Sequence, residues 1–290
     1  SASKVCELIA QTHTLKKLSL SHNRLSKAFL RKLQGSLGSS TMESLDLSYN
    51  QFDSTHSLVI ESIFRTSSSI AIYDLSGNSL TDSVVTDLAD ALSTNETVRT
   101  LFLNNTGIGD ASALALGKAL TTNSTLLTIS LKSNKIESNG AIGIAQGLLQ
   151  NGSLENLYLD DNEVDDRAVS SLVEVLKETH SLFKVGFDLN HFSVNGLAQI
   201  QSAITEHDRR MKESVAHTAS NFITTLNERA KKADTLRAEL KETQSHLKQR
   251  QADLELLKEQ YKAPMLEAER EIKDLKDRID LEEQKQRAIT

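Results

Sequence analysis

Hydrophobic residues recur through the first two thirds of the chain in units of about 28 residues. Each unit opens with the pattern LxxLxLxxNxL, as in "LENLYLDDNEV" at residues 154–164. Alternation of this kind predicts a short β-strand with Leu157 and Leu159 on one face and Tyr158 on the other. The first half of each unit is therefore expected to be a strand with one buried side.

The second half of each unit has a different rhythm, with apolar residues three and four positions apart. Such spacing predicts a helix with one buried face. Two consecutive examples are Ala141, Ile144 and Leu148, then Val169, Leu172 and Leu176.

A polar residue follows each predicted strand at the same position of the unit. It is asparagine in six units, with Thr106 in the remaining place: Asn23, Asn50, Asn78, Asn134, Asn162 and Asn190. An asparagine amide both donates and accepts hydrogen bonds, so it can satisfy backbone groups of a buried turn and of the next unit. Thr106 has only a hydroxyl, and a locally weaker link is expected there.

One strand and one helix cannot bury their apolar faces alone, so the units are expected to stack. The predicted fold is an α/β solenoid of about seven repeats, with a concave parallel sheet and convex helices, over residues 1–206. Units of this form resemble leucine-rich repeats of the ribonuclease-inhibitor type, and the resemblance covers residues 4–206. The opening residues look like the closing half of a repeat, so we expect the chain to be part of a longer one.

Three sequons, at Asn95, Asn123 and Asn151, occupy one position of the repeat, where a predicted helix ends. Glycosylation of a secreted protein is one interpretation. A structural asparagine at the helix end explains all three with one cause, and we prefer it.

Residues 207–290 no longer follow the repeat and read as a continuous helix. Apolar residues in alternating steps of three and four indicate a coiled coil. The predicted dimerisation seam contains Phe222, Leu226, Leu236, Leu240, Leu247, Leu254, Leu257 and Tyr261. Arg229, Thr243 and Arg250 are polar entries in it. We favour a homodimer, with a parallel pair ahead of a higher oligomer, while a different partner chain, the strand orientation and a solitary charged helix remain open.

Pro264 lies inside this helix, where the apolar spacing also shifts. A kink or break is expected because proline removes a backbone donor and crowds the preceding turn. The pattern is compatible with one bent helix and with a second helix that folds back.

The composition and charge of the chain exclude or disfavour several kinds of protein. The only cysteine is Cys6, which excludes an internal disulfide, and no apolar run is long enough to cross a bilayer. The net charge is −6, and residues after 206 contribute 18 of the 33 basic and 17 of the 39 acidic residues. The repeats are therefore acidic, which disfavours nucleic acid, and no basic stripe suggests a membrane surface. A cytoplasmic location is expected.

No catalytic or cofactor-binding motif stands out: the eight histidines are scattered and no CxxC, HExxH or phosphate-binding loop occurs. We expect no enzyme activity, cofactor or metal.

The residues that face outward from the strands are the candidate partner-binding site. Aromatic anchors with an acidic border suit a basic or amphipathic protein segment. The candidates are Phe102, Tyr158, Asp160, Asp188, Asp46, Asp74 and Lys132. An aromatic at such a position can also be present without any partner.

Repeats followed by a coil such as "LRAELKETQSHLKQRQADLELLKEQ" resemble centrosomal and ciliary leucine-rich-repeat coiled-coil proteins. The resemblance implies a cytoskeleton-associated scaffold that binds proteins and dimerises. Ran GTPase-activating proteins have similar repeats but a strongly acidic tail, whereas this tail is balanced in charge. An actin-capping role like that of the tropomodulins is a third hypothesis, although those proteins carry their repeats at the C-terminal end.

Overall fold

The computed structural model describes residues 2–12, 14–38 and 40–289. The chain forms two compact units, Ser1–Val215 and Ala216–Thr290. The first contains all the repeats that the sequence predicts.

Seven parallel strands within the described residues form a single sheet in the first unit, and they lie in sequence order from β1 to β7. The strands are β1 (Lys17–Ser19), β2 (Ser44–Asp46), β3 (Ile72–Asp74), β4 (Thr100–Phe102), β5 (Thr128–Ser130), β6 (Asn156–Tyr158) and β7 (Lys184–Gly186). Each strand lies in register with the equivalent residues of the next repeat.

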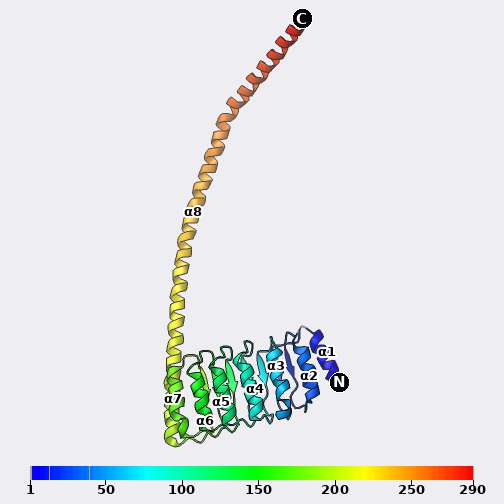
Figure 1. Cartoon of the computed structure of the whole chain (residues 1–290). Coiled ribbons are helices and arrows are strands. Elements are labelled where there is room, and N and C mark those ends of the chain that lie inside the picture. The colour runs from blue at the N-terminus through cyan, green and yellow to red at the C-terminus, as the bar shows by residue number, and fades with distance from the viewer. Residues whose placement is uncertain (1, 13, 39, 290) are drawn as a thin grey trace. The chain divides into compact units, whose positions relative to one another are not determined.

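Helices cover one face of this sheet and stand side by side in one layer (Figure 1). They are α1 (Ala2–Gln11), α2 (Lys27–Leu37), α3 (Ser57–Thr66), α4 (Asp82–Ser93), α5 (Asp110–Leu120), α6 (Ser138–Leu148), α7 (Val169–Glu178) and the start of α8 (Val194–Ile289). Short 3-10 helices, η1 (Ser54–His56) and η2 (Asp166–Ala168), precede α3 and α7. The predicted repeat solenoid is confirmed. We call the sheet face away from the helices the open face.

The core lies between the sheet and the helix layer. The inward residues of β2 to β6 are fully buried, as at Leu45, Leu101 and Leu157, and so are the periodic helix positions Leu88 and Leu116. The inward residues of the edge strands, Leu18 and Val185, are partly buried. Because every repeat supplies the same positions, the apolar interior runs continuously from repeat to repeat.

The asparagines that follow the strands form a ladder, and Asn134 illustrates a complete rung. Its Oδ1 accepts hydrogen bonds from the backbone N–H groups of Thr106 at 2.9 Å and Ile108 at 3.2 Å in the preceding repeat. Its Nδ2 donates to the carbonyl oxygens of Leu103 at 2.8 Å and Leu131 at 2.9 Å. One amide thus satisfies buried backbone groups of two repeats, as the sequence predicts.

The rung at Thr106 is incomplete. The Thr106 hydroxyl donates to the Leu103 carbonyl at 2.8 Å and lies 3.1 Å from Asn134 Oδ1. In the preceding repeat, however, the N–H groups of Asn78 and Leu80 have no acceptor anywhere in the described part of the chain. The missing bond of the Leu80 N–H agrees with the expected weak link, because the equivalent N–H donates to the amide oxygen at the rungs of Asn50, Asn78, Asn134, Asn162 and Asn190.

A second ladder joins the C-terminal ends of the helices. Asn123 Nδ2 donates to the Leu92 carbonyl at 2.7 Å and to the Asn95 carbonyl at 3.1 Å. Asn151 repeats this arrangement on Leu120 and Asn123. Asn123 and Asn151 are buried, which confirms their structural role within the sequons.

Contacts between α8 and α7 continue beyond residue 206, the predicted end of the repeats. The His207 ring is buried, with Nδ1 2.8 Å from the Leu176 carbonyl oxygen and Nε2 against that of Leu182. The Arg210 guanidinium donates to the carbonyls of Leu176 and Lys177 at the C-terminal end of α7, where a cation is favoured. The sequence places the boundary after residue 206, and these contacts extend the first unit to Val215.

The second unit consists of the remainder of α8, which continues through Pro264 to Ile289. Figure 1 draws this helix as continuous, with a bend in its orange part, and Pro264 lies within the helix. Of the two arrangements open from the sequence, the single bent helix is the one observed. Proline removes one N–H and displaces one carbonyl, a local loss that the neighbouring turns bridge.

Candidate functional site

The open face displays two rows of side chains that cross the seven strands of the described chain. The register places the last residue of each strand in one row: Ser19, Asp46, Asp74, Phe102, Ser130, Tyr158 and Gly186. The second row lies two residues further on and includes Asn104, Lys132, Asp160 and Asp188. Every residue of the predicted partner-binding site belongs to one of these rows.

Asp46 is fixed by serines on both sides. Its carboxylate accepts hydrogen bonds at 2.6 Å from the hydroxyls of Ser19 and Ser48, and at 3.0 Å from the Ser48 N–H. Burial raises the pKa of Asp46, but these hydrogen bonds, helped by the nearby His22, outweigh it and hold the pKa below its ordinary value. Asp46 is therefore a fixed anionic group near the N-terminal end of the face.

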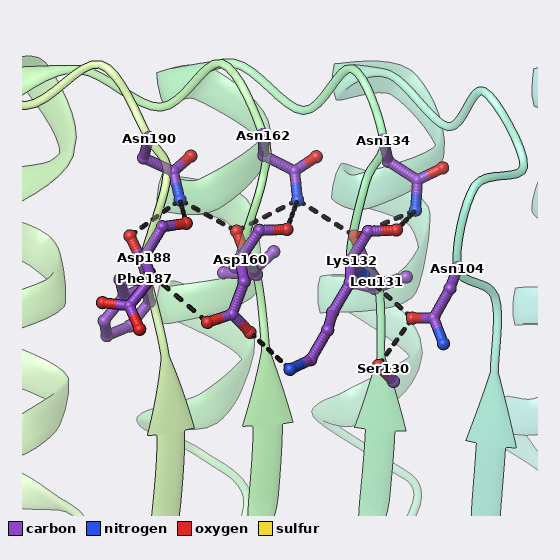
Figure 2. Close-up of polar contacts among 11 residues, drawn as sticks. Asn104, Ser130, Leu131, Lys132, Asn134, Asp160, Asn162, Phe187, Asp188 and Asn190 are labelled. Atoms are coloured by element: carbon purple, nitrogen blue, oxygen red, sulfur yellow. Dashed lines mark hydrogen bonds and ion pairs between the residues drawn. The ribbon is translucent and has the colours of Figure 1, made fainter.

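Tyr158 is the centre of a cluster of charged groups on β6 and its neighbours. Lys132 Nζ forms an ion pair with Asp160 Oδ2 at 3.1 Å and lies over the Tyr158 ring, 4.6 Å from its centre. Lys184 Nζ lies 5.7 Å from the same ring centre. Cations at these positions are attracted to the ring face. Figure 2 shows Lys132 reaching from its strand end toward the Asp160 carboxylate.

Hydrogen bonds on both sides of this ion pair involve Asn104 and the backbone of Asp188. Asn104 Oδ1 accepts hydrogen bonds from the Ser130 hydroxyl at 2.6 Å and from the Lys132 N–H at 3.0 Å (Figure 2). The Asp188 N–H donates to Asp160 Oδ1 at 3.4 Å. These bonds position the Asp160 carboxylate and the backbone of Lys132, and the ion pair in turn positions the ammonium group.

Gly186 makes room for Asp160. A Cβ atom at residue 186 would lie 2.3 Å from Asp160 Oδ2, which no real contact allows. The glycine in the outward row of β7 is therefore a condition for the carboxylate to lie over the sheet.

The structure separates the two predicted aromatic anchors. Phe102 is on β4 and Tyr158 on β6, with Ser130 of β5 between them, so their strands are about 10 Å apart. Both rings are half-buried. Asp74 lies beside Phe102 in the register and accepts from the Ser76 N–H at 2.9 Å. Phe102 and Tyr158 thus form two contact points rather than one.

Sequence reasoning missed an aromatic pair at the N-terminal end of the sheet. The His22 and Tyr49 rings stack with centres 4.5 Å apart and planes within 5°. Both residues have positive φ, 58° and 52°, which is uncommon for large side chains. The equivalent positions of the next two repeats hold Gly77 and Asn105, residue types that tolerate positive φ and have it here. The large rings of His22 and Tyr49 at this position were the signal that the sequence offered.

The predicted seam of α8 is exposed in the single chain. Its side chains range from 46% exposed at Leu226 to 64% at Phe222. Apolar side chains on one stripe of a helix, with nothing covering them, form the second candidate surface of the chain.

Metal binding and membrane insertion are two further possibilities for the described residues. No three histidine, cysteine or acidic side chains there are grouped so that they could hold a metal ion. None of the described helices is long and apolar enough to span a bilayer.

Known proteins resemble the first unit of the chain. Residues 76–206 match the family model described as the TMOD/LMOD Leucine-rich domain, and residues 38–55 match a Leucine Rich repeat model. No curated protein sequence matches the chain.

Three solved structures are similar to parts of the chain. A leiomodin-1 fragment titled Actin-Binding Site 2 is 24% identical, covers 49% of this chain and 82% of its own, and has a TM-score of 0.43. The tropomodulin C-terminal domain of Caenorhabditis elegans is 12% identical, with 75% and 99% coverage and a TM-score of 0.38. LegL7 from Legionella pneumophila is 17% identical, with 71% and 77% coverage and a TM-score of 0.42.

The family matches agree with the parallel strands, the asparagine ladder and the helix layer of the first unit. The chain is a leucine-rich-repeat protein.

Proposed function

We propose that the chain is a non-enzymatic protein-binding scaffold of a cytoplasmic, cytoskeletal structure such as a centrosome, basal body or cilium. In this proposal the open face binds a segment of a partner protein, and the seam of α8 joins two copies of the chain. Pairing would raise the effective concentration of the binding faces.

The repeats are assigned to the ribonuclease-inhibitor type. The period of 28 residues, with a full helix in nearly every repeat, supports this subtype. The repeat subtype does not identify a binding partner.

The observation that carries the scaffold proposal is the cluster around Tyr158. An aromatic ring with fixed charges beside it can bury apolar area and also select the charge of a partner. Asp160 is already paired with Lys132, whereas Asp188, Asp46 and Asp74 have no ion-pair partner among the described residues. The free carboxylates favour a segment with basic side chains, whose apolar residues would rest on Phe102 and Tyr158.

Removing both aromatic anchors is expected to abolish partner capture. Phe102→Ala together with Tyr158→Ala removes the two aromatic contact points, and such anchors often account for about 2 kcal/mol or more each. Proximity labelling in cells, with the wild-type and double-variant chains at equal expression, measures the change.

The matched control is Leu58→Ala. Leu58 is 70% exposed on α3, in the helix layer, so its loss should leave the labelled set unchanged. A double variant that folds and still labels the same proteins would show that the open face is not the binding surface.

Actin filaments are a second candidate partner. The match of residues 76–206 to the TMOD/LMOD Leucine-rich domain favours this function over the Ran GTPase-activating type, since tropomodulins are the actin-capping family considered above. The leiomodin-1 fragment is itself named for an actin-binding site.

Sedimentation with filamentous actin tests this second function. If actin is the partner, the wild-type chain and Leu58→Ala pellet with filaments, and the Phe102→Ala, Tyr158→Ala variant pellets much less. A wild-type chain that stays in the supernatant with both filaments and filament ends in excess would remove actin from consideration.

A further inference from the structure

The residues in the seam of α8 between Phe222 and Tyr261 favour one relative orientation of two paired helices. We propose that this segment pairs with a second copy of the chain in the antiparallel orientation, centred between Lys241 and Glu242. The inference rests on the self-association in the proposed function and adds its orientation and register.

A parallel pair in register would place each seam residue opposite its own copy. Arg229 and Arg250 occupy seam positions, so a parallel dimer would bring two arginines together in two separate layers. Beside the seam, Lys232 would face the partner's Arg237, five residues further along, the usual flanking contact of a parallel coil. Like charges at such short range weaken the pair.

An antiparallel pair centred between Lys241 and Glu242 matches residues that are equally far from that midpoint. Every seam residue then finds another seam residue, and no arginine meets an arginine. The layers are Phe222 with Tyr261, Leu226 with Leu257, Arg229 with Leu254, Ala233 with Arg250, Leu236 with Leu247, and Leu240 with Thr243.

The side chains in these layers complement one another in size and character. Arg250, the longest, meets Ala233, the smallest, which leaves space for its apolar stem while its charged end reaches water. Phe222 and Tyr261 meet at both ends of the paired segment. All the large apolar members are exposed in the single chain and available for this burial.

The charges beside the seam also favour this arrangement. Lys232 lies within two residues of the partner's Asp253 along the axis, about 3 Å in height. Glu239 is placed in the same way beside the partner's His246. Symmetry repeats both contacts. A parallel coil would also have an attractive contact, between Asp253 and the partner's Lys258, so the antiparallel pair keeps an attraction at Asp253 and loses the repulsion between Lys232 and Arg237.

Neighbouring antiparallel registers are worse. A shift of one heptad toward the C-terminus brings Pro264 opposite Leu226 and Glu239 beside the partner's Asp253. The opposite shift brings Glu239 beside its own copy. Both replace the attraction at the flanks by repulsion between carboxylates.

The orientation has a consequence for assembly. The two copies of Phe222 would lie at opposite ends of the coil, about 60 Å apart for a segment of this length. Chain continuity then attaches one repeat domain at each end, so the dimer would join two binding partners that are well separated.

Cysteine cross-linking in the full chain tests the orientation. Cys6→Ala removes the only native cysteine, and Leu226→Cys or Leu257→Cys is added to that background. The antiparallel pair predicts a disulfide-linked dimer in an equal mixture of the two variants and none in either variant alone. Sedimentation equilibrium on the same samples measures self-association.

The outcomes separate the two proposals. Cross-linking of each variant with itself would overturn the antiparallel orientation while leaving self-association intact. A chain that remains a monomer in sedimentation, with no cross-link in any sample, would overturn both.

A charge reversal provides a test of opposite sign. Lys232→Glu is expected to weaken the antiparallel dimer about tenfold at low salt, because two attractive contacts become repulsive. Adding Asp253→Lys should restore the affinity. In a parallel dimer Lys232→Glu would instead strengthen association by facing the partner's Arg237, so a tighter dimer would overturn the proposal.

Discussion

Replacing Asn134 by alanine is expected to lower the free energy of unfolding of the repeat domain by about 4 kcal/mol. The substitution leaves the N–H groups of Thr106 and Ile108 in buried turns without an acceptor, and each such loss costs about 1–3 kcal/mol when water cannot enter. It also removes one hydrogen bond from each of the Leu103 and Leu131 carbonyls, which keep Thr106 and Asn162 as donors. Urea unfolding followed by circular dichroism measures the loss.

The loss of stability should be smaller for ladder asparagines that are less buried. Asn190 makes equivalent bonds to Val164 and Leu159 but is only half-buried, so Asn190→Ala should cost about half as much. Asn23 is exposed and, among the described residues, its side chain donates only to the carbonyls of Leu20 and Ser21 in its own turn, so Asn23→Ala should cost less than about 1 kcal/mol. Equal losses at all three positions would contradict the ladder as the source of stability.

Completing the rung at Thr106 should instead stabilise the domain. Thr106→Asn supplies the amide oxygen that the N–H groups of Asn78 and Leu80 lack, and it should raise the free energy of unfolding by about 1 kcal/mol. Thr106→Val, which removes the hydroxyl bond to Leu103, is the matched control and should lower it.

Gly147→Ala is expected to destabilise the domain by about 2 kcal/mol, although alanine is the better helix former. A Cβ atom at residue 147 of α6 would lie 2.0 Å from the carbonyl oxygen of Gly117 in α5. The obstacle is backbone, so the two helices must separate, and overpacking of this kind costs about 1–3 kcal/mol or more. This cost outweighs the gain of about 1 kcal/mol from helix propensity.

Gly35→Ala is the control for this prediction. Gly35 lies within α2 and a Cβ atom there would meet nothing within 4 Å, so only the propensity gain of up to about 1 kcal/mol remains. The two substitutions should therefore change the midpoint of guanidinium unfolding in opposite directions. A shift in the same direction would show that the close approach of α5 and α6 does not limit stability.

The features that could be predicted from the sequence are those that depend on residues close together in the chain. The alternation around Leu157 and Leu159 and the helical spacing of Leu172 and Leu176 depend on neighbours within one repeat. Seven repetitions of the same local pattern make it hard to misread. The weak rung at Thr106 was equally visible, because an amide and a hydroxyl differ in the bonds they can make.

The candidate site was predictable only as rows. Strand alternation placed Tyr158, Phe102 and Asp160 on the open face, but the pairing of Lys132 with Asp160 depends on which way two long side chains turn. The half-burial of the rings and the space left by Gly186 for Asp160 depend on atoms one repeat away, in positions that vary from repeat to repeat.

The sequence by itself therefore determined the repeat period, the strand and helix of each repeat, the asparagine ladder and the long C-terminal helix. Only the tertiary structure decided that α5 and α6 approach through glycine backbones, that His207 and Arg210 hold α8 to the end of α7, and that α8 continues through Pro264. The reason is that periodic patterns record which face of an element is buried. Distances between particular atoms of adjacent elements arise only when the elements are packed together.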